Sequence, residues 1–288
     1  MWQKIKKDID DIVEGKKIYN RLKMKCHKHV MYISQHPAIG DAYLVASYLK
    51  IFIQKKDVVT FIGQASKKVY ELYKFENLVE LTQWQTDSLI RYVQFMEISS
   101  DEVVILHYQA LVEHTGLAFQ FNGVRGLCFS ELLEKMVFRG YEYTDRFYPN
   151  LNRTINFTNV EKNSSVIFFP YANTLNTPPL EFWSEVIDRY IERGKSVYTY
   201  VWKNEKPLKK TIPITCELTE IFYLVEWAGE LVGVRNGIMD LVSQSKCKKT
   251  IYYPKHGAES WINGSIKEFW SLKKFGYGTL CNEIEWGD

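Results

Sequence analysis

The sequence lacks paired cysteines, a long apolar run and an excess of one charge, and each absence removes a class of protein. The five cysteines are odd in number and form no C-x-x-C pair, so neither a disulfide framework nor a zinc site is indicated. No apolar run approaches the ~20 residues of a membrane-spanning helix, and residues 1–13 lack the apolar core of a secretory signal. With 37 basic and 34 acidic residues, the charge is too balanced for a typical nucleic-acid-binding protein. We therefore expect a globular cytoplasmic protein with reduced thiols and no nucleic-acid partner.

Four common catalytic signatures are also missing. There is no G-x-x-x-x-G-K-[ST] phosphate loop, and no G-x-G-x-x-G follows the first predicted strand. The G-x-S-x-G turn of serine hydrolases and the H-E-x-x-H helix of zinc peptidases do not occur either. The sequence therefore gives no support to a P-loop enzyme, a dinucleotide dehydrogenase or a hydrolase of these types.

What the sequence does contain is an alternation of short apolar strands with helices. This alternation predicts an α/β fold with mostly parallel, doubly wound sheets. Strands are expected at residues 29–34, 58–63, 78–81, 103–107, 165–170, 196–202 and 230–234, and in the apolar run that ends at Tyr253. Helices are expected at 42–52, 67–73, 87–97, 130–138, 180–193, 217–228, just after Gly237, and at 266–274, with irregular chain at 141–157, 203–216 and beyond 274.

A stretch rich in Asn, Pro and Thr before residue 160 is the expected linker. It predicts an N-terminal domain over 1–160 and a C-terminal domain over 161–288. We expect two Rossmann-like domains that face a cleft, because ligands of such folds bind beyond the carboxyl ends of the strands.

The first residues of the chain form a separate feature, an amphipathic helix. Trp2, Ile5, Ile9, Ile12 and Val13 recur at helical spacing with charged residues between them. One interpretation is that this helix packs on its own domain. The alternative is a peripheral contact with a membrane surface, which the following lysines favour: Lys4, Lys6, Lys7, Lys16 and Lys17.

Polar residues follow several of the predicted strands, and their loops should gather at the carboxyl edge of each sheet. A glycine in such a turn lets the backbone approach a phosphate, although most strand-to-helix turns bind nothing. In the first domain the candidate site residues are His36, Gly40 and Asp41. In the second domain they are Tyr171, Asn173, Thr174, Lys203, Arg235, Asn236, Gly237 and Asp240.

Three segments read together resemble the heptosyltransferase family. Residues 36–41 (H-P-A-I-G-D), followed by A-Y-L-V-A-S-Y-L-K, look like its first strand, turn and helix. Residues 230–240 (E-L-V-G-V-R-N-G-I-M-D) are similar to its donor turn, and residues 166–193 resemble the opening of the donor domain in the same GT-B class. The turn departs from the heptosyltransferase pattern of an acidic or amide residue, then Ser or Thr, then Gly. It resembles instead the G-x-R-[SN]-G turn of bacterial fucosyltransferase-like proteins.

This resemblance implies roles for individual residues. Asp41 would be the general base for an acceptor hydroxyl, with His36 as the alternative base. Arg235 and the N–H groups after Gly237 would hold the diphosphate of the donor. The residues alone leave other roles open: Asp41 as a helix cap, His36 as an ordinary loop histidine, and Arg235 in a structural salt bridge to Asp240 or Glu230.

The function that the resemblance implies is that of a glycosyltransferase of polysaccharide biosynthesis. It would move a sugar from a nucleotide diphosphate-sugar, with a GDP-sugar favoured by the Arg235 turn, to a glycan or lipid-linked glycan. The paired-glutamate pattern of retaining GT-B enzymes is absent, so we expect an inverting, metal-independent mechanism without a cofactor. The alternative is a two-domain α/β protein that binds a nucleotide or a partner without catalysis.

Overall fold

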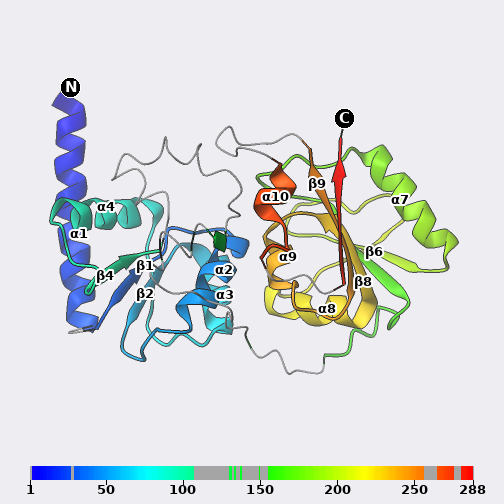
Figure 1. Ribbon diagram of the computed structural model, residues 1–288, viewed down its shortest axis with the longest axis horizontal. Coiled ribbons are helices and arrows are strands. Elements are labelled where there is room, and N and C mark those ends of the chain that lie inside the picture. The colour runs from blue at the N-terminus through cyan, green and yellow to red at the C-terminus, as the bar shows by residue number, and fades with distance from the viewer. Residues whose placement is uncertain are drawn as a thin grey trace. The chain divides into compact units, whose positions relative to one another are not determined.

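The computed structural model describes residues 2–26, 29–106, 155–255, 265–275 and 280–287, and five single residues between 130 and 149. They divide into two compact units, each with its own parallel β-sheet (Figure 1). The first unit holds the described residues up to 149, and the second holds residues 155–287. The predicted helix at 130–138 and the irregular stretch at 141–157 lie mostly outside the described residues.

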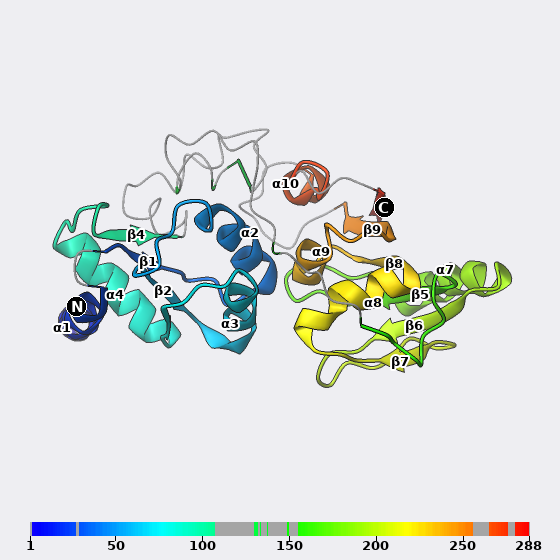
Figure 2. The same cartoon turned by 90° about the horizontal axis from the view of Figure 1, so that it is seen from below.

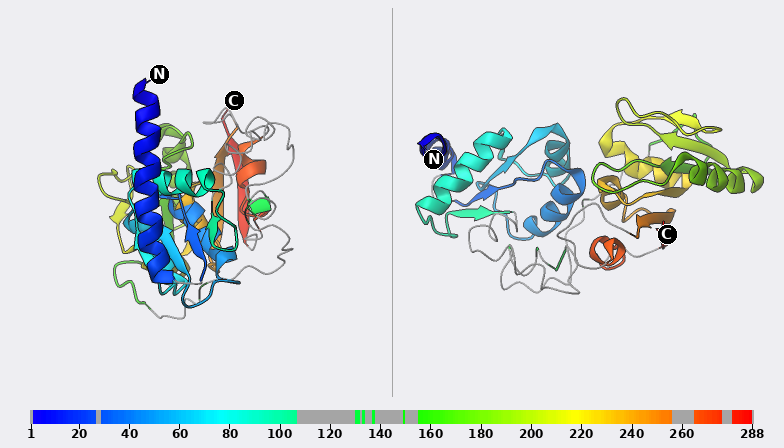
Figure 3. Two further views of the ribbon diagram at one scale, coloured as in Figure 1. Left: turned by 90° about the vertical axis from the view of Figure 1, so that its left-hand side faces the viewer. Right: turned by 90° about the horizontal axis from the view of Figure 1, so that it is seen from above.

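The first unit is a four-stranded sheet with strand order β3-β2-β1-β4, in which every pairing is parallel. Figures 2 and 3 show α1 and α4 on one face of this sheet and α2 and α3 on the other. The elements are α1 (Trp2–Cys26), β1 (Met31–Ile33), α2 (Ile39–Leu49), β2 (Val58–Phe61), α3 (Gly63–Leu72), β3 (Leu78–Glu80), α4 (Gln83–Phe95) and β4 (Val103–Ile105).

The amphipathic N-terminal helix is confirmed as α1, and one of its faces packs on the first unit. Ile18 and Leu22 are buried in a core cluster with Met31 and Ile33 of β1 and with Leu89 of α4. No helix of the described residues is long and apolar enough to cross a membrane.

The second unit is a six-stranded parallel sheet with order β10-β9-β8-β5-β6-β7. Phe168 of β5 and Trp183 of α7 belong to a buried cluster between the sheet and that helix. The elements are β5 (Ser165–Phe169), α7 (Leu180–Glu192), β6 (Ser196–Tyr200), β7 (Ile212–Ile214), η3 (Leu218–Glu220), α8 (Ile221–Ala228), β8 (Gly229–Val234), α9 (Gly237–Leu241), β9 (Lys248–Pro254), α10 (Ile266–Trp270) and β10 (Cys281–Trp286).

Each sheet has one point where the strand order reverses. In the first unit it lies between β1 and β4, and in the second between β5 and β8. Loops that leave neighbouring strands in opposite directions open a crevice there, which is where open α/β sheets bind ligands. The loops after β1, β4, β5 and β8 are therefore the places to look for a site.

Several predicted elements differ from the structure. Strands β7 and β10 lie where irregular chain was expected, and both are edge strands, which tolerate the proline at 213 and the glutamates at 283 and 285. The helix predicted to begin at 87 begins at Gln83, because Thr82 and Gln85 form a capping box. The last helix ends at Trp270 rather than at 274.

The second unit also begins before the boundary predicted at 161. Val160 is buried, and its carbonyl accepts a hydrogen bond from Trp227 Nε1 at 2.7 Å. The carbonyl of Asn159 accepts one from Tyr198 Oη at 2.9 Å. These contacts attach the residues just before 161 to α8 and β6 of the second unit.

Candidate functional site

The first candidate site lies at the switch point of the first unit, where the loop after β1 meets the end of β4. His36 in this loop is 3% exposed, and its Nε2 lies 2.9 Å from the carbonyl oxygen of Leu106, the residue after β4. Because a carbonyl only accepts hydrogen bonds, Nε2 must carry the proton of this one. The histidine therefore joins the two loops that flank the crevice.

Asp41 faces the other ring nitrogen of His36. Its Oδ2 lies 3.7 Å from His36 Nδ1, and its side chain is 31% exposed whereas that of His36 is 3% exposed. Asp41 is in the first turn of α2, but the N-cap residue is Ala38, so Asp41 is not a plain helix cap. Of the two side chains, the carboxylate is the one that a ligand can reach.

Buried hydroxyl groups hold the loop of His36 in place. Ser66 Oγ donates to the carbonyl of His36 at 2.6 Å, and Tyr70 Oη donates to Ser34 Oγ at 2.8 Å. Burial raises the pKa of Tyr70 well above its ordinary value, and the nearby charge of Asp41 raises it further. Tyr70 thus stays a neutral donor, and the backbone that carries His36 is fixed from the α3 side.

The second candidate site lies at the switch point of the second unit, and Asn236 is its central residue. Asn236 Nδ2 donates to the carbonyl of Tyr171 at 2.8 Å, which connects the turn after β8 to the loop after β5. Its Oδ1 accepts the backbone N–H groups of Ile238 and Met239, so Asn236 also caps α9. The two loops that sequence reasoning singled out are therefore joined by one amide side chain.

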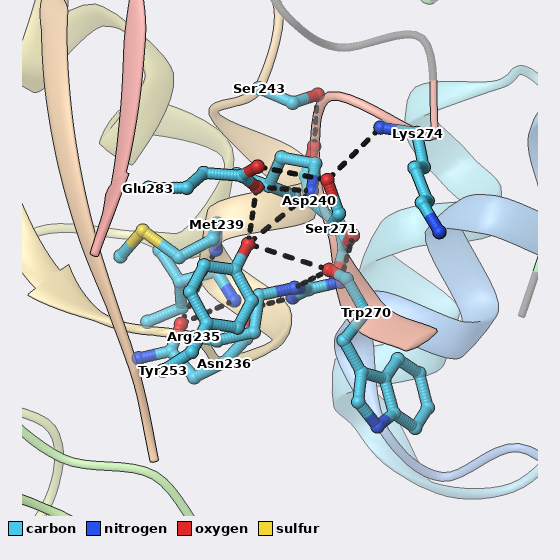
Figure 4. A network of polar contacts seen from close by, with 12 residues as sticks. Arg235, Asn236, Met239, Asp240, Ser243, Tyr253, Trp270, Ser271, Lys274 and Glu283 are labelled. Atoms are coloured by element: carbon cyan, nitrogen blue, oxygen red, sulfur yellow. Dashed lines mark hydrogen bonds and ion pairs between the residues drawn. The ribbon is translucent and has the colours of Figure 1, made fainter. Parts of the chain in front are cut away.

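Arg235, the expected diphosphate ligand, lies in a buried ion pair within the protein. Its side chain is 4% exposed and forms a two-pronged ion pair with Asp240, at 2.7 and 2.8 Å (Figure 4). Its Nε also donates to the carbonyl of Trp270 at 2.9 Å, and Nη1 donates to that of Asn236 at 2.6 Å. A buried guanidinium that is surrounded by protein acceptors is not presented to a ligand. Arg235 and Asp240 instead shape the turn, as the salt-bridge alternative proposed.

A second set of hydrogen bonds holds the chain around Trp270 in position (Figure 4). Glu283 of β10 accepts hydrogen bonds from Tyr253 Oη at 2.7 Å, from Ser271 Oγ at 2.9 Å and from the Leu272 N–H at 2.8 Å. Burial raises the pKa of Tyr253, which keeps this phenol a donor. The carbonyl that Arg235 contacts is thus set by a strand that sequence reasoning did not predict.

The loops after β5 and β6 are also connected to each other. Tyr171 Oη donates to the carbonyl of Lys206 at 2.6 Å, and Glu205 accepts the Trp202 N–H at 2.9 Å. Burial raises the pKa of Glu205. The pKa of Tyr171 is also raised, mainly by burial and secondly by the nearby charge of Glu205. Sequence reasoning missed Glu205, because an acid between lysines in a loop has no distinctive spacing.

A mostly buried stack of aromatic rings and several exposed polar residues complete this edge of the sheet. The ring of Tyr200 stacks on that of Phe169 at 5.2 Å and on that of Trp202 at 6.4 Å. The predicted residues Asn173, Thr174 and Lys203 are exposed, and Tyr171, Asn236 and Gly237 are half-buried. Of these rings, Phe169 and Tyr200 are buried and Trp202 is half-buried, so this edge presents exposed polar groups beside one partly accessible indole.

The fold and the two switch points define a two-unit protein of the Rossmann type. No family model and no curated protein sequence matches the chain. A search of solved structures finds Escherichia coli ADP-heptose lipopolysaccharide heptosyltransferase II, with a TM-score of 0.54, 10% identity, and coverage of 88% of this chain and 90% of that one.

Two further structures show the same likeness. A family 9 glycosyltransferase from Veillonella parvula has a TM-score of 0.53 at 11% identity, over 90% of this chain and 86% of that one. The E. coli heptosyltransferase WaaC with ADP-2-deoxy-2-fluoro heptose has a TM-score of 0.51 at 12% identity, over 89% and 93%. These matches confirm the predicted α/β fold of the GT-B type. The resemblance to fucosyltransferase-like proteins stays a prediction.

Proposed function

We propose that the protein is a glycosyltransferase that moves a sugar from a nucleotide diphosphate-sugar to a hydroxyl of a glycan or lipid-linked glycan. The observation that carries this proposal is the His36–Asp41 pair at the switch point of the first unit. It is supported by a fold shared with heptosyltransferases and a family 9 glycosyltransferase. The first unit would receive the acceptor, and the second unit would bind the donor.

Asp41 is the general base of the proposed reaction. Its partly exposed carboxylate would take the proton of the acceptor hydroxyl as that oxygen attacks the anomeric carbon and the nucleoside diphosphate departs. His36 lies beside this carboxylate, with its Nδ1 3.7 Å from Asp41 Oδ2, and its Nε2 donates to the carbonyl of Leu106, which holds the ring in place. His36 would thus assist Asp41 rather than act as the base itself.

The donor would bind at the switch point of the second unit. Asn173, Thr174 and Lys203 are the exposed polar groups there, and Tyr171, Asn236 and Gly237 form the backbone frame between them. Arg235 and Asp240 enter this proposal as residues that shape the turn. The reaction is proposed to be inverting and independent of metal, with the carboxylate of Asp41 as the proton acceptor.

The test measures both binding and turnover. Titration calorimetry with ADP, GDP, UDP and their sugars identifies the donor, and release of the nucleoside diphosphate with lipid-linked glycan extracts measures transfer. Replacing Asp41→Asn should lower turnover by about 10²–10⁴-fold while nucleotide affinity stays within about twofold. The exposed acid Asp101, changed to Asn, is the matched control and should keep full activity.

Two outcomes would overturn the proposal. Full activity of Asp41→Asn would remove this residue as the base, whatever the donor is. If no nucleotide or nucleotide-sugar binds, the alternative of a non-catalytic α/β partner-binding protein is favoured instead.

A further inference from the structure

Helix α1 buries one face and leaves the opposite face without a covering element in the described residues. The buried face is fixed by Asp11, which accepts from Trp84 Nε1 at 3.0 Å and pairs with Arg91 at 2.9 Å. On the opposite face Ile9 is 55% exposed and Val13 49% exposed, and Met24 further along is 70% exposed. Three large apolar side chains on one outward face of a helix are unusual unless that face contacts something.

The exposed charges of α1 are mostly positive. Among residues 6–25, whose side chains the structure describes, two acidic side chains are exposed: that of Asp10, and that of Asp8, which is 48% exposed and pairs with Arg91 of α4 at 2.8 Å. The exposed cationic side chains are those of Lys6, Lys7, Lys16, Lys17, Arg21 and Lys25. An apolar ridge flanked by cations is complementary to an anionic lipid surface, in which apolar acyl chains lie beneath negatively charged headgroups.

The placement of α1 in its unit leaves this face accessible. Figures 1 and 3 show that the N-terminal turns of α1 extend beyond α4 and the sheet of the first unit. The asparagine and lysines between Val13 and Met24 interrupt the ridge, so it lacks the continuous apolar seam that a helix pair needs. Two copies of α1 would also bring like charges together, whereas anionic lipid would neutralise them.

We propose that the outward face of α1 docks the protein on an anionic membrane surface. Ile9, Val13 and Met24 insert among the acyl chains near the headgroups, and the flanking lysines and Arg21 contact lipid phosphates. Lys residues suit this task because their long stems lie along apolar surface while the ammonium stays at the headgroup level. This proposal does not depend on the glycosyltransferase reaction, since it concerns a different face of the first unit's fold.

The experiment is flotation of the full chain with vesicles of phosphatidylcholine alone or mixed with phosphatidylglycerol. The protein should float only with the anionic vesicles, and less at high salt because salt screens the contact. Two variants test the two parts of this face: Ile9→Ser/Val13→Ser and Lys6→Gln/Lys16→Gln/Lys17→Gln. Each should lower the partition coefficient of the protein between vesicles and water by about tenfold or more.

Matched controls come from the second unit. Leu180 and Ile212 are 63% and 55% exposed, so Leu180→Ser/Ile212→Ser removes equivalent apolar surface and should leave flotation unchanged. The exposed lysines 206, 209 and 246, changed to Gln, control for total charge. Equal melting temperatures and helix content would show that all variants fold.

Equal flotation with both vesicle types, no flotation, or equal loss in the controls would overturn the proposal. The proposal would also be overturned if the protein did not float but sedimented as a dimer, and if Ile9→Ser/Val13→Ser abolished that dimer.

Discussion

Arg235 was expected to bind a diphosphate, and the structure places its side chain in a buried ion pair with Asp240. A guanidinium has five N–H donors, and here four hydrogen bonds from it reach Asp240 and two backbone carbonyls. Removing the arginine leaves a buried carboxylate without its counter-charge, which costs about 3–5 kcal/mol in comparable cases. We therefore predict that Arg235→Ala and Asp240→Ala each lower the free energy of unfolding by about 3 kcal/mol or more, measured by urea denaturation.

The double variant distinguishes the ion pair from its neighbours. Because Arg235→Ala/Asp240→Ala removes both charges, its loss should be smaller than the sum of the single losses by about 2 kcal/mol or more. The exposed pair Lys210–Asp188, at 2.7 Å with side chains 56% and 42% exposed, is the matched control. Its coupling energy should stay below about 1 kcal/mol. Equal coupling in the two pairs would contradict a buried structural role for Arg235.

At the scale of elements, the contact between α1 and α4 depends on Gly15. A Cβ atom at this position would lie 2.1 Å from the Ser88 carbonyl oxygen and 2.6 Å from Tyr92 Cβ. Alanine is the better helix former by about 1 kcal/mol, but backbone overlap of this size forces the two helices apart. We predict that Gly15→Ala lowers the free energy of unfolding by about 2 kcal/mol or more.

A matched substitution on the outward face of the same helix isolates this effect. Asn20 is exposed, so Asn20→Ala adds helix propensity without a clash and should stabilise by about 0.5 kcal/mol. Urea denaturation of both variants gives the comparison. If Gly15→Ala stabilised the protein like Asn20→Ala, the close approach of α1 and α4 would be refuted.

The elements that sequence reasoning predicted are those whose signal is local. The strand at 165–169 is a run of five buried residues, and α1 and α7 repeat apolar residues at helical spacing. Strand β10 was not predicted, because its glutamates interrupt the apolar pattern and because a long connection separates it from its partner β9. Pairing between distant segments has no local signature.

The candidate site was predictable to a similar extent. The Gly40-Asp41 turn identified His36 and Asp41, and the structure places these two side chains 3.7 Å apart. The link from His36 to Leu106 could not be foreseen, because it depends on β1 and β4 being neighbours. The burial of Arg235 was equally hidden, since it depends on a contact with Trp270, 35 residues further along the chain.

For the whole molecule, buried ionisable groups determine how stability changes with pH. Among the described residues, the thiols with altered pKa values all lie in the second unit. Burial raises the pKa of Cys216 to about 12 and that of Cys281 to about 11, and it also raises the pKa of Cys247. Lys249 is 1% exposed and donates to the carbonyls of Ser245 and Cys247, and burial lowers its pKa.

These shifts have opposite signs in the linkage between protonation and folding. A thiol whose pKa is raised on folding contributes its full stability below its unfolded pKa of about 8.5 and loses it as the pH rises toward the folded value. An amine whose pKa is lowered adds stability as the pH rises through the interval between its folded and unfolded values. Three thiols oppose one amine, and the buried tyrosines with raised pKa values, such as Tyr70 and Tyr253, act in the same direction as the thiols as the pH approaches their unfolded pKa of about 10.

We predict that the free energy of unfolding falls between about pH 8.5 and pH 10 by about 1 kcal/mol per pH unit, after allowance for partial solvent access of the thiols. Urea denaturation at several pH values measures the slope. Cys216→Ala/Cys281→Ala should flatten it, because two raised pKa values are removed, while Lys249→Met should steepen it, because the opposing amine is lost. The slope is the informative quantity, since each substitution also changes packing by an amount that does not vary with pH. A flat profile in the unaltered protein, or a steeper one in Cys216→Ala/Cys281→Ala, would show that buried thiols do not contribute this slope between about pH 8.5 and pH 10.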